Sequence, residues 1–242
     1  MKRVAFLSIF TMGCIASLGA HAATHDFNNI EGTGKLKISI VPLSTATHEY
    51  FSIAETNHSH VNVRIRNHTL YLHQSGSTPS HVTIHMNTLN HLSLYGDSSI
   101  TAHNIHSHGL SLHTNTTGKI NLSGMINVNE IAVSGPSHVT MKWIRGNNLA
   151  LYSSNHAHIT IAGNIAMVRA KLSGHSFLNA KNLRTQHTWI VTRDYAQAEI
   201  LPTASLQAYP QGNSNIYYYK NPRLLNSANQ EAGNTLQLGW KD

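Results

Sequence analysis

The chain has 242 residues, of which 40% are hydrophobic and 11% are charged. This hydrophobic content supports a sizeable core and excludes an intrinsically disordered chain. A single cysteine excludes a disulfide-bonded scaffold, and 17 basic against 10 acidic residues give a formal net charge of +7.

Residues 1–22 have the features of an export signal. A basic start precedes a largely apolar run from Val4 to Leu18, and an A-x-A cleavage pattern ends at Ala22. We expect cleavage after Ala22 and export to the periplasm, the cell surface or the medium. The apolar run is shorter than the ~20 residues of a membrane-spanning helix, and no later stretch is apolar enough to cross a membrane. Lipidation of Cys14 is the alternative to simple cleavage.

Short runs in which apolar and polar residues alternate dominate the remaining chain, and they predict β-strands. Lys35–Ile40 and Val61–Ile65 are examples, and a hairpin is expected near Asn67. Signals for helices are almost absent. The mature chain, 23–242, is therefore expected to be one all-β domain.

From about residue 90 the apolar pattern repeats every 39 residues. One series comprises Leu94, Val133 and Leu172, and a second set of apolar positions lies half a period away. Interleaving the two sets gives steps of about 20 residues, which indicates stacked supersecondary units.

These observations predict a right-handed parallel β-helix with about 20 residues per coil. A leucine-rich repeat would need a recurring asparagine and a helical return segment, neither of which recurs. A β-sandwich fits residues 30–80 but does not explain the constant spacing. Gly96, Gly135 and Gly174 recur at the same interval and predict a tight corner with positive φ. We assign 24–85 to an N-terminal cap and early coils, 86–220 to regular coils and 221–242 to a C-terminal cap.

Several segments resemble one known family. They are Leu92–Gly96, Ser134-Gly135, Ser173-Gly174 and the run from Gly212 to Pro222. Together with the strands near residues 34–38 and 67–72, they are similar to the head GIN domain family, which is described as autotransporter-adhesin-like. The resemblance implies an exported bacterial parallel β-helix with no established catalytic activity, and it carries over no catalytic residues.

Parallel β-helices often act on polysaccharides, so a lyase or hydrolase is the alternative to a non-enzymatic role. Such chemistry needs paired carboxylates or clustered acids that bind calcium. The repeat region offers only four acids, and none has an acidic neighbour 39 residues away; they are Asp97, Glu130, Asp194 and Glu199. We therefore expect no enzyme activity and no cofactor.

The chain contains 19 histidines and three H-x-H pairs. These are 58–60, 106–108 and 156–158, and two imidazoles on one strand face could reach one metal ion. A tight site needs three or four ligands, and no nearby cysteine or aspartate completes these pairs. We expect exposed strand positions and no metal site.

The 39-residue spacing also aligns basic residues in two columns, which we call the basic ridge. One column holds His103, Lys142, Lys181 and Lys220, and the other holds His106, Arg145, Arg184 and Arg223. The ridge either keeps the solenoid soluble or docks an anionic polysaccharide or another component of the cell envelope. Nucleic acid is not expected as a partner, and the sequence leaves the oligomeric state open. The favoured function is an adhesin-like binding module, and a purely structural envelope protein is a further alternative.

Overall fold

The computed structural model describes residues 26–43, 48–54 and 59–239. The predicted export signal and Cys14 lie outside the described residues. Within these ranges the chain forms strands and no helix, and thus contains no helix that could span a membrane. The sixteen strands are β1 (Asn29–Gly34), β2 (Leu36–Val41), β3 (Tyr50–Ala54), β4 (Ser59–Arg66), β5 (Thr69–Gly76), β6 (Ser80–His85), β7 (His91–Gly96), β8 (Ser99–Thr116), β9 (Lys119–Ser134), β10 (His138–Ser153), β11 (His158–Leu172), β12 (Phe177–Thr192), β13 (Gln197–Pro210), β14 (Asn215–Tyr218), β15 (Leu224–Ser227) and β16 (Asn234–Gln237).

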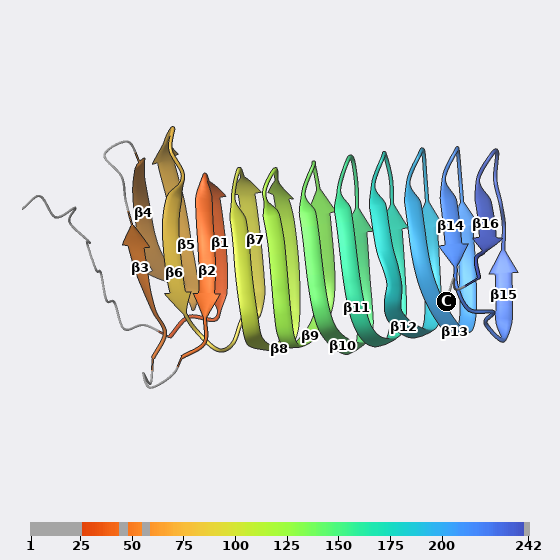
Figure 1. Cartoon of the computed structure of the whole chain (residues 1–242), viewed down its shortest axis with the longest axis horizontal. Helices are drawn as coiled ribbons and strands as arrows, with labels where there is room; N and C mark the ends of the chain where they lie inside the picture. Colours follow the sequence, from red (N-terminus) through yellow and green to blue (C-terminus); the bar gives the residue numbers. More distant parts are fainter. Residues whose placement is uncertain (1–25, 44–47, 55–58, 240–242) are drawn as a thin grey trace, which may run out of the picture.

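These strands stack side by side along the long axis of the molecule (Figure 1). Neighbouring strands from β7 to β14 pair in parallel, each one coil further along the chain. The result is a parallel β-solenoid of about seven turns with a spacing of about 20 residues. The predicted all-β parallel β-helix is therefore confirmed.

The 39-residue spacing predicted that Val133 stacks between Leu94 and Leu172, and the register confirms it. Thr114 pairs with both Leu94 and Val133, and Ser153 pairs with both Val133 and Leu172. All five side chains are buried. Each coil therefore adds one layer to a continuous hydrophobic core that runs the length of the solenoid.

The predicted glycine corner is confirmed, and residues other than glycine adopt the same conformation on intervening coils. Gly96, Gly135 and Gly174 have φ values of 82°, 68° and 69°. Asn155 and Asp194, on alternate coils, adopt φ values of 62° and 61°. Asparagine and aspartate tolerate this left-handed region better than other side chains do, so they can replace glycine at the corner.

The first strands do not lie at the end of the solenoid. β1 pairs in parallel with both β5 and β7, and β2 with both β6 and β8. The first coil is thus inserted between later ones, as Figure 1 shows. β3 and β4 lie outside it in antiparallel pairs with β6 and β5. The β4–β5 pair is the hairpin expected near Asn67.

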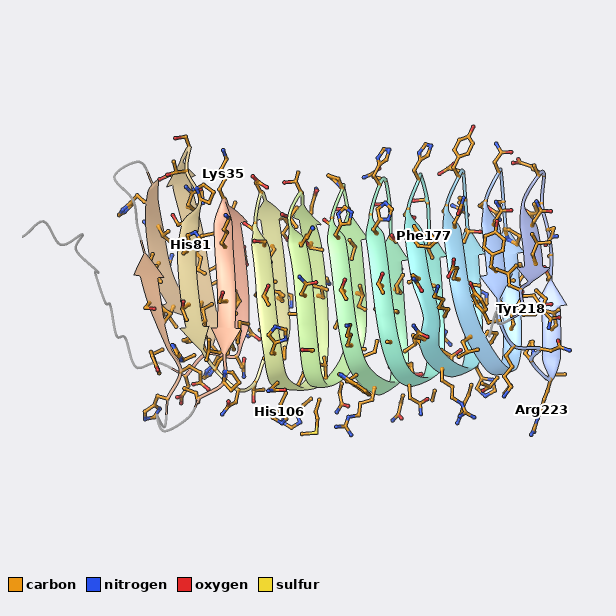
Figure 2. The ribbon with its side chains drawn as sticks, in the orientation of Figure 1. Lys35, His81, His106, Phe177, Tyr218 and Arg223 are labelled. Carbon is orange, nitrogen blue, oxygen red and sulfur yellow. The ribbon has the colours of Figure 1, made fainter. Side chains whose placement is uncertain are left out.

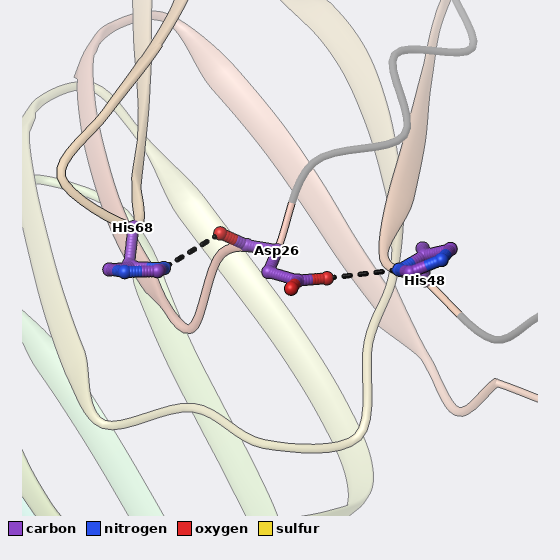
Figure 3. Close-up of polar contacts among 3 residues, drawn as sticks. All are labelled: Asp26, His48 and His68. Atoms are coloured by element: carbon purple, nitrogen blue, oxygen red, sulfur yellow. Dashed lines mark hydrogen bonds and ion pairs between the residues drawn. The ribbon is translucent and has the colours of Figure 1, made fainter.

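Polar contacts connect the start of the described chain to two neighbouring segments (Figure 3). His48 Nδ1 lies 3.0 Å from a carboxylate oxygen of Asp26, and His68 Nδ1 lies 3.1 Å from the Asp26 main-chain oxygen. Because the groups are exposed, these contacts position the chain more than they stabilise it.

At the C-terminal end, β15 and β16 pair in parallel with β13 and β14, and so extend the solenoid. Leu224, Leu225 and Leu236 are exposed there. The boundaries of the N- and C-terminal caps remain predictions.

Candidate functional site

The central residues of the predicted basic ridge lie where the long strands bend. The backbone adopts positive φ near the same position of four successive coils, at Asn104, Gly124, Trp143 and Gly163. The strand register also shifts at these bends. This is a second corner, which we call the bend corner, and the side chains beside it point outward. Figure 2 shows His106 and Arg223 projecting from the lower edge of the solenoid.

The first half of the ridge forms a connected series across three coils. His103 Nδ1 lies 2.9 Å from Ser123 Oγ, and Ser123 pairs with Lys142 on the next strand. His106 pairs with Met125. The side chains of His103, His106 and Lys142 are all exposed, so an external anion can approach them.

Two arginines of the ridge lie two coils apart. Arg145 pairs with Asn164, and Asn164 pairs with Arg184. Both arginines are exposed, and two coils correspond to roughly 10 Å at the strand spacing of a sheet. This separation is about one Debye length at physiological salt, so the two charges repel each other only weakly.

The ridge changes character at its C-terminal end. Lys181 Nζ lies 3.5 Å from Glu199 Oε2, and the Tyr219 hydroxyl donates to the same oxygen at 3.1 Å. Burial raises the pKa of Tyr219, and the charge of Glu199 and this hydrogen bond raise it further. Lys181 is therefore partly neutralised, whereas Lys220 and Arg223 are exposed.

Two apolar side chains that the sequence analysis did not single out lie among these cations. Trp143 is 75% exposed and Met125 is 53% exposed. They line an open depression of about 990 Å³ together with Lys142 and Arg145. A large residue with positive φ is an uncommon and strained arrangement, and here it holds an indole ring outside the core.

The sequence repeat contains evidence that Trp143 is exposed. The positions 39 residues before, 39 after and 78 after it are all asparagine: Asn104, Asn182 and Asn221. A tryptophan in a column that is otherwise polar indicates a solvent-facing position.

Histidines stack near the glycine corner, away from the ridge. The rings of His138 and His158 are 5.0 Å apart, and those of His156 and His175 are 5.1 Å apart. Burial lowers the pKa of His158, and the neighbouring His138 and His156 lower it further. Among the residues that the structure describes, no group of three or more metal-ligating side chains is placed to hold a metal ion.

The acids of the repeat region have separate partners. Asp97 accepts a hydrogen bond from Thr117, and Glu130 lies 3.5 Å from His113. An Asp194 oxygen accepts from the main chain of Gly174, and Glu199 contacts Lys181 and Tyr219. No contact between two carboxylates is found within the described ranges.

Fold and surface place the chain in the class of parallel β-solenoids that present regularly spaced side chains on their outer faces. Residues 26–222 match the family described as "Putative auto-transporter adhesin, head GIN domain". The chain belongs to this adhesin-like family, which confirms the resemblance noted in the sequence. No curated protein sequence matches the chain.

Solved structures share the fold at low sequence identity. An adhesin candidate from Parabacteroides merdae has a TM-score of 0.74 and 19% identity, covering 89% of this chain and 94% of its own. A protein from Parabacteroides distasonis named as a candidate lipid-binding protein has a TM-score of 0.73 and 15% identity, with the same coverage. An adhesin candidate from the same species has a TM-score of 0.71 and 16% identity, covering 93% of this chain and 95% of its own.

Proposed function

We propose that this chain is an exported, non-enzymatic, adhesin-like binding module that docks anionic glycans or other polymers of the cell envelope through the basic ridge. Membership of an adhesin-like family supports the binding role and the export. The observation that carries the site is the exposed ring of Trp143 in one depression with the exposed Lys142 and Arg145, and the exposed Arg184 lies two coils from Arg145. Several cations on one edge of a rigid scaffold attract a polyanion over a range set by the salt concentration.

The separate partners of the acids support a non-enzymatic role. Hydrolysis of a glycosidic bond needs two carboxylates that face one bond, and calcium-assisted cleavage needs several oxygen ligands. Each acid of the repeat region instead contacts a hydroxyl, a main-chain amide or a basic side chain.

Heparin serves as a defined polyanion for the test. A variant with Lys142→Gln, Arg145→Gln and Arg184→Gln should bind heparin at least about tenfold more weakly than the unmodified chain, a loss typical of a few charged contacts. The matched control removes three exposed cations outside the ridge, with Lys37→Gln, Arg66→Gln and Lys119→Gln. Equal weakening by both variants would assign the attraction to net charge and contradict the ridge as a site.

A second candidate ligand is an anionic lipid surface. The exposed Trp143 and Met125 favour it, because tryptophan beside basic residues is typical of contacts with the membrane interface. The structural relative named as a candidate lipid-binding protein also supports it. Vesicles containing phosphatidylglycerol should then bind the chain and lose binding with Trp143→Ala, while heparin binding is retained. Absence of binding to both probes would favour a purely structural envelope protein.

A further inference from the structure

A second surface lies on the outer face of the solenoid, in the strand segments between the bend corner and the glycine corner. Tyr95, Tyr152, Trp189 and Tyr209 line an open hollow of about 850 Å³, which we call the aromatic trough. Tyr95 and Tyr152 are 40% and 45% exposed. Their rings are therefore only partly engaged in packing.

The register places the trough residues in rows along the solenoid axis. Tyr152 pairs with Lys171, Lys171 with Val191, and Val191 with Tyr209. At ~4.8 Å per coil, this row is roughly 14 Å long. In the adjacent row, the Trp189 ring lies 6.1 Å from the Tyr209 ring, and Lys171 Nζ lies 6.0 Å from the Trp189 centroid.

Small polar side chains also line the trough. Ser134, Ser154 and Ser173 occupy equivalent positions on three successive coils and line the hollow. The main-chain ladder continues through them, because Ser154 N donates to Val133 O and Ser173 N donates to Ser153 O. Aromatic rings beside hydroxyl groups offer both stacking surfaces and hydrogen-bond partners.

The trough also carries positive charge. Lys171 and Arg193 line it and are exposed, and Arg193 Nε donates to Gln211 Oε1 at 2.9 Å. Among the described residues, no ion pair neutralises either cation. A ligand with negative charges is therefore favoured over a neutral one.

We propose that the aromatic trough binds a linear acidic polysaccharide that runs along the solenoid axis. Sugar rings stack on Tyr152, Trp189 and Tyr209, and their carboxylates contact Lys171 and Arg193. One sugar unit is about as long as the spacing between coils, ~4.8 Å, so successive units meet successive coils in register. The inference rests on the proposed glycan-binding function but assigns it a second surface, separate from the basic ridge.

Other occupants fit the trough less well. An apolar peptide would cover the charges of Lys171 and Arg193 without supplying a negative group, which is costly once water is excluded. Single-stranded nucleic acid also stacks on aromatic rings, and it is therefore a competing outcome of the test.

The binding experiment uses oligogalacturonate as the acidic probe, with a neutral cello-oligosaccharide and an oligothymidylate beside it. The single-tryptophan chain Trp143→Phe/Trp240→Phe keeps Trp189 as the only reporter among the three tryptophans. We expect oligogalacturonate to change the emission of Trp189, the neutral sugar to bind more weakly, and the nucleotide to bind least. Equal binding of the neutral sugar would overturn the acidic assignment, and preferred binding of the nucleotide would overturn the glycan.

A second set of variants, made without the two Trp→Phe changes, then locates the contact. Trp189→Ala/Tyr209→Ala should weaken oligogalacturonate binding by at least about tenfold per lost ring, and Trp143→Ala is the matched loss of an exposed ring outside the trough. Tyr152→Ser, at a more exposed position, repeats the test with less risk to folding. Retained heparin binding by the trough variants shows that the fold and the ridge are intact. If oligogalacturonate binding survives all trough variants, the trough is not its site. If the ridge variant loses heparin and oligogalacturonate together, one charged surface binds both probes and the trough inference is wrong.

Discussion

The geometry of the glycine corner can be tested at Gly174. Its φ of 69° lies in a region that costs an ordinary L-residue roughly 1–2 kcal/mol. A Cβ atom there would lie 2.9 Å from Asn155 N and 3.0 Å from Asn155 Cα. The Asn155 backbone has little freedom to yield, because its carbonyl accepts a hydrogen bond from His175 N at 2.6 Å. Such overpacking destabilises the folded state by roughly a further 1–3 kcal/mol. Alanine also makes the unfolded chain less flexible than glycine does, which offsets about 0.4–1 kcal/mol of this loss.

Gly174→Ala should therefore lower the free energy of unfolding by about 2–3 kcal/mol. For a domain of this size that corresponds to a decrease in Tm of roughly 4–12 °C, measured by circular dichroism during heating. Gly239→Ala is the matched control, because no heavy atom lies within 4 Å of its added Cβ. Asn155→Gly, at the equivalent position of the preceding coil, should change stability by less than about 1 kcal/mol. If Gly174→Ala melts at the same temperature as Gly239→Ala, the corner does not require glycine and the reasoning is wrong.

Three further outcomes follow from the packing and the charges. Leu151→Ala removes a fully buried side chain stacked between Ile131 and Ala170 and should cost about 2–5 kcal/mol in urea unfolding; Leu225→Ala, on the exposed last coil, should cost far less. The pKa of His158 is lowered in the folded protein, so the unfolded chain binds protons more readily and stability should fall as the pH drops below about 6.5. His158→Asn should reduce the difference in Tm between pH 7.5 and pH 5.5, and an unchanged difference would contradict this origin. Heparin binding should be tighter at pH 5 than at pH 7.5 in equal salt, because histidine is the side-chain type that gains positive charge over this range; equal binding at both pH values would exclude the histidines as contributors.

The stacking of the core could be predicted because it depends on two properties that a sequence displays. Strand alternation separates buried from exposed residues, and a constant coil length places equivalent buried residues above one another. Leu94, Val133 and Leu172 therefore stack as expected through Thr114 and Ser153. In this column the intermediate residues are small and polar, so its apolar members recur every 39 residues. In other columns, such as that of Ile131, Leu151 and Ala170, every coil contributes an apolar residue and the step is about 20.

The order of the first coils could not be predicted in the same way. β1 pairs with β5 and β7 although β5 follows it by some 40 residues. Both arrangements, with β1 inside or at the end, bury the same apolar face of the strand. The antiparallel β3 and β4 pair with β6 and β5 outside the first coil, and this pairing is not encoded in the repeat.

Side-chain positions in the ridge could not be fully predicted from the 39-residue spacing, because the ridge lies at the bend corner. A register shift lies between Ala180 and Arg184, so no strand partner on the next coil fixes the position of Lys181. It instead meets Glu199, a contact between adjacent coils that a 39-residue spacing skips. Straight segments preserve the spacing of side chains from coil to coil, whereas bends preserve only the sign of their charge.

This difference separates the two surfaces by the kind of recognition that each can support. The ridge, on irregular bends, can attract a polyanion through its summed charge without requiring that each cation meet one particular group. The trough lies on strands whose register is unbroken from Lys171 to Tyr209. Stacking of rings requires fixed positions, and only this second surface provides them. A polymer held by the ridge can therefore slide along the axis, whereas a polymer seated in the trough is held at a defined register.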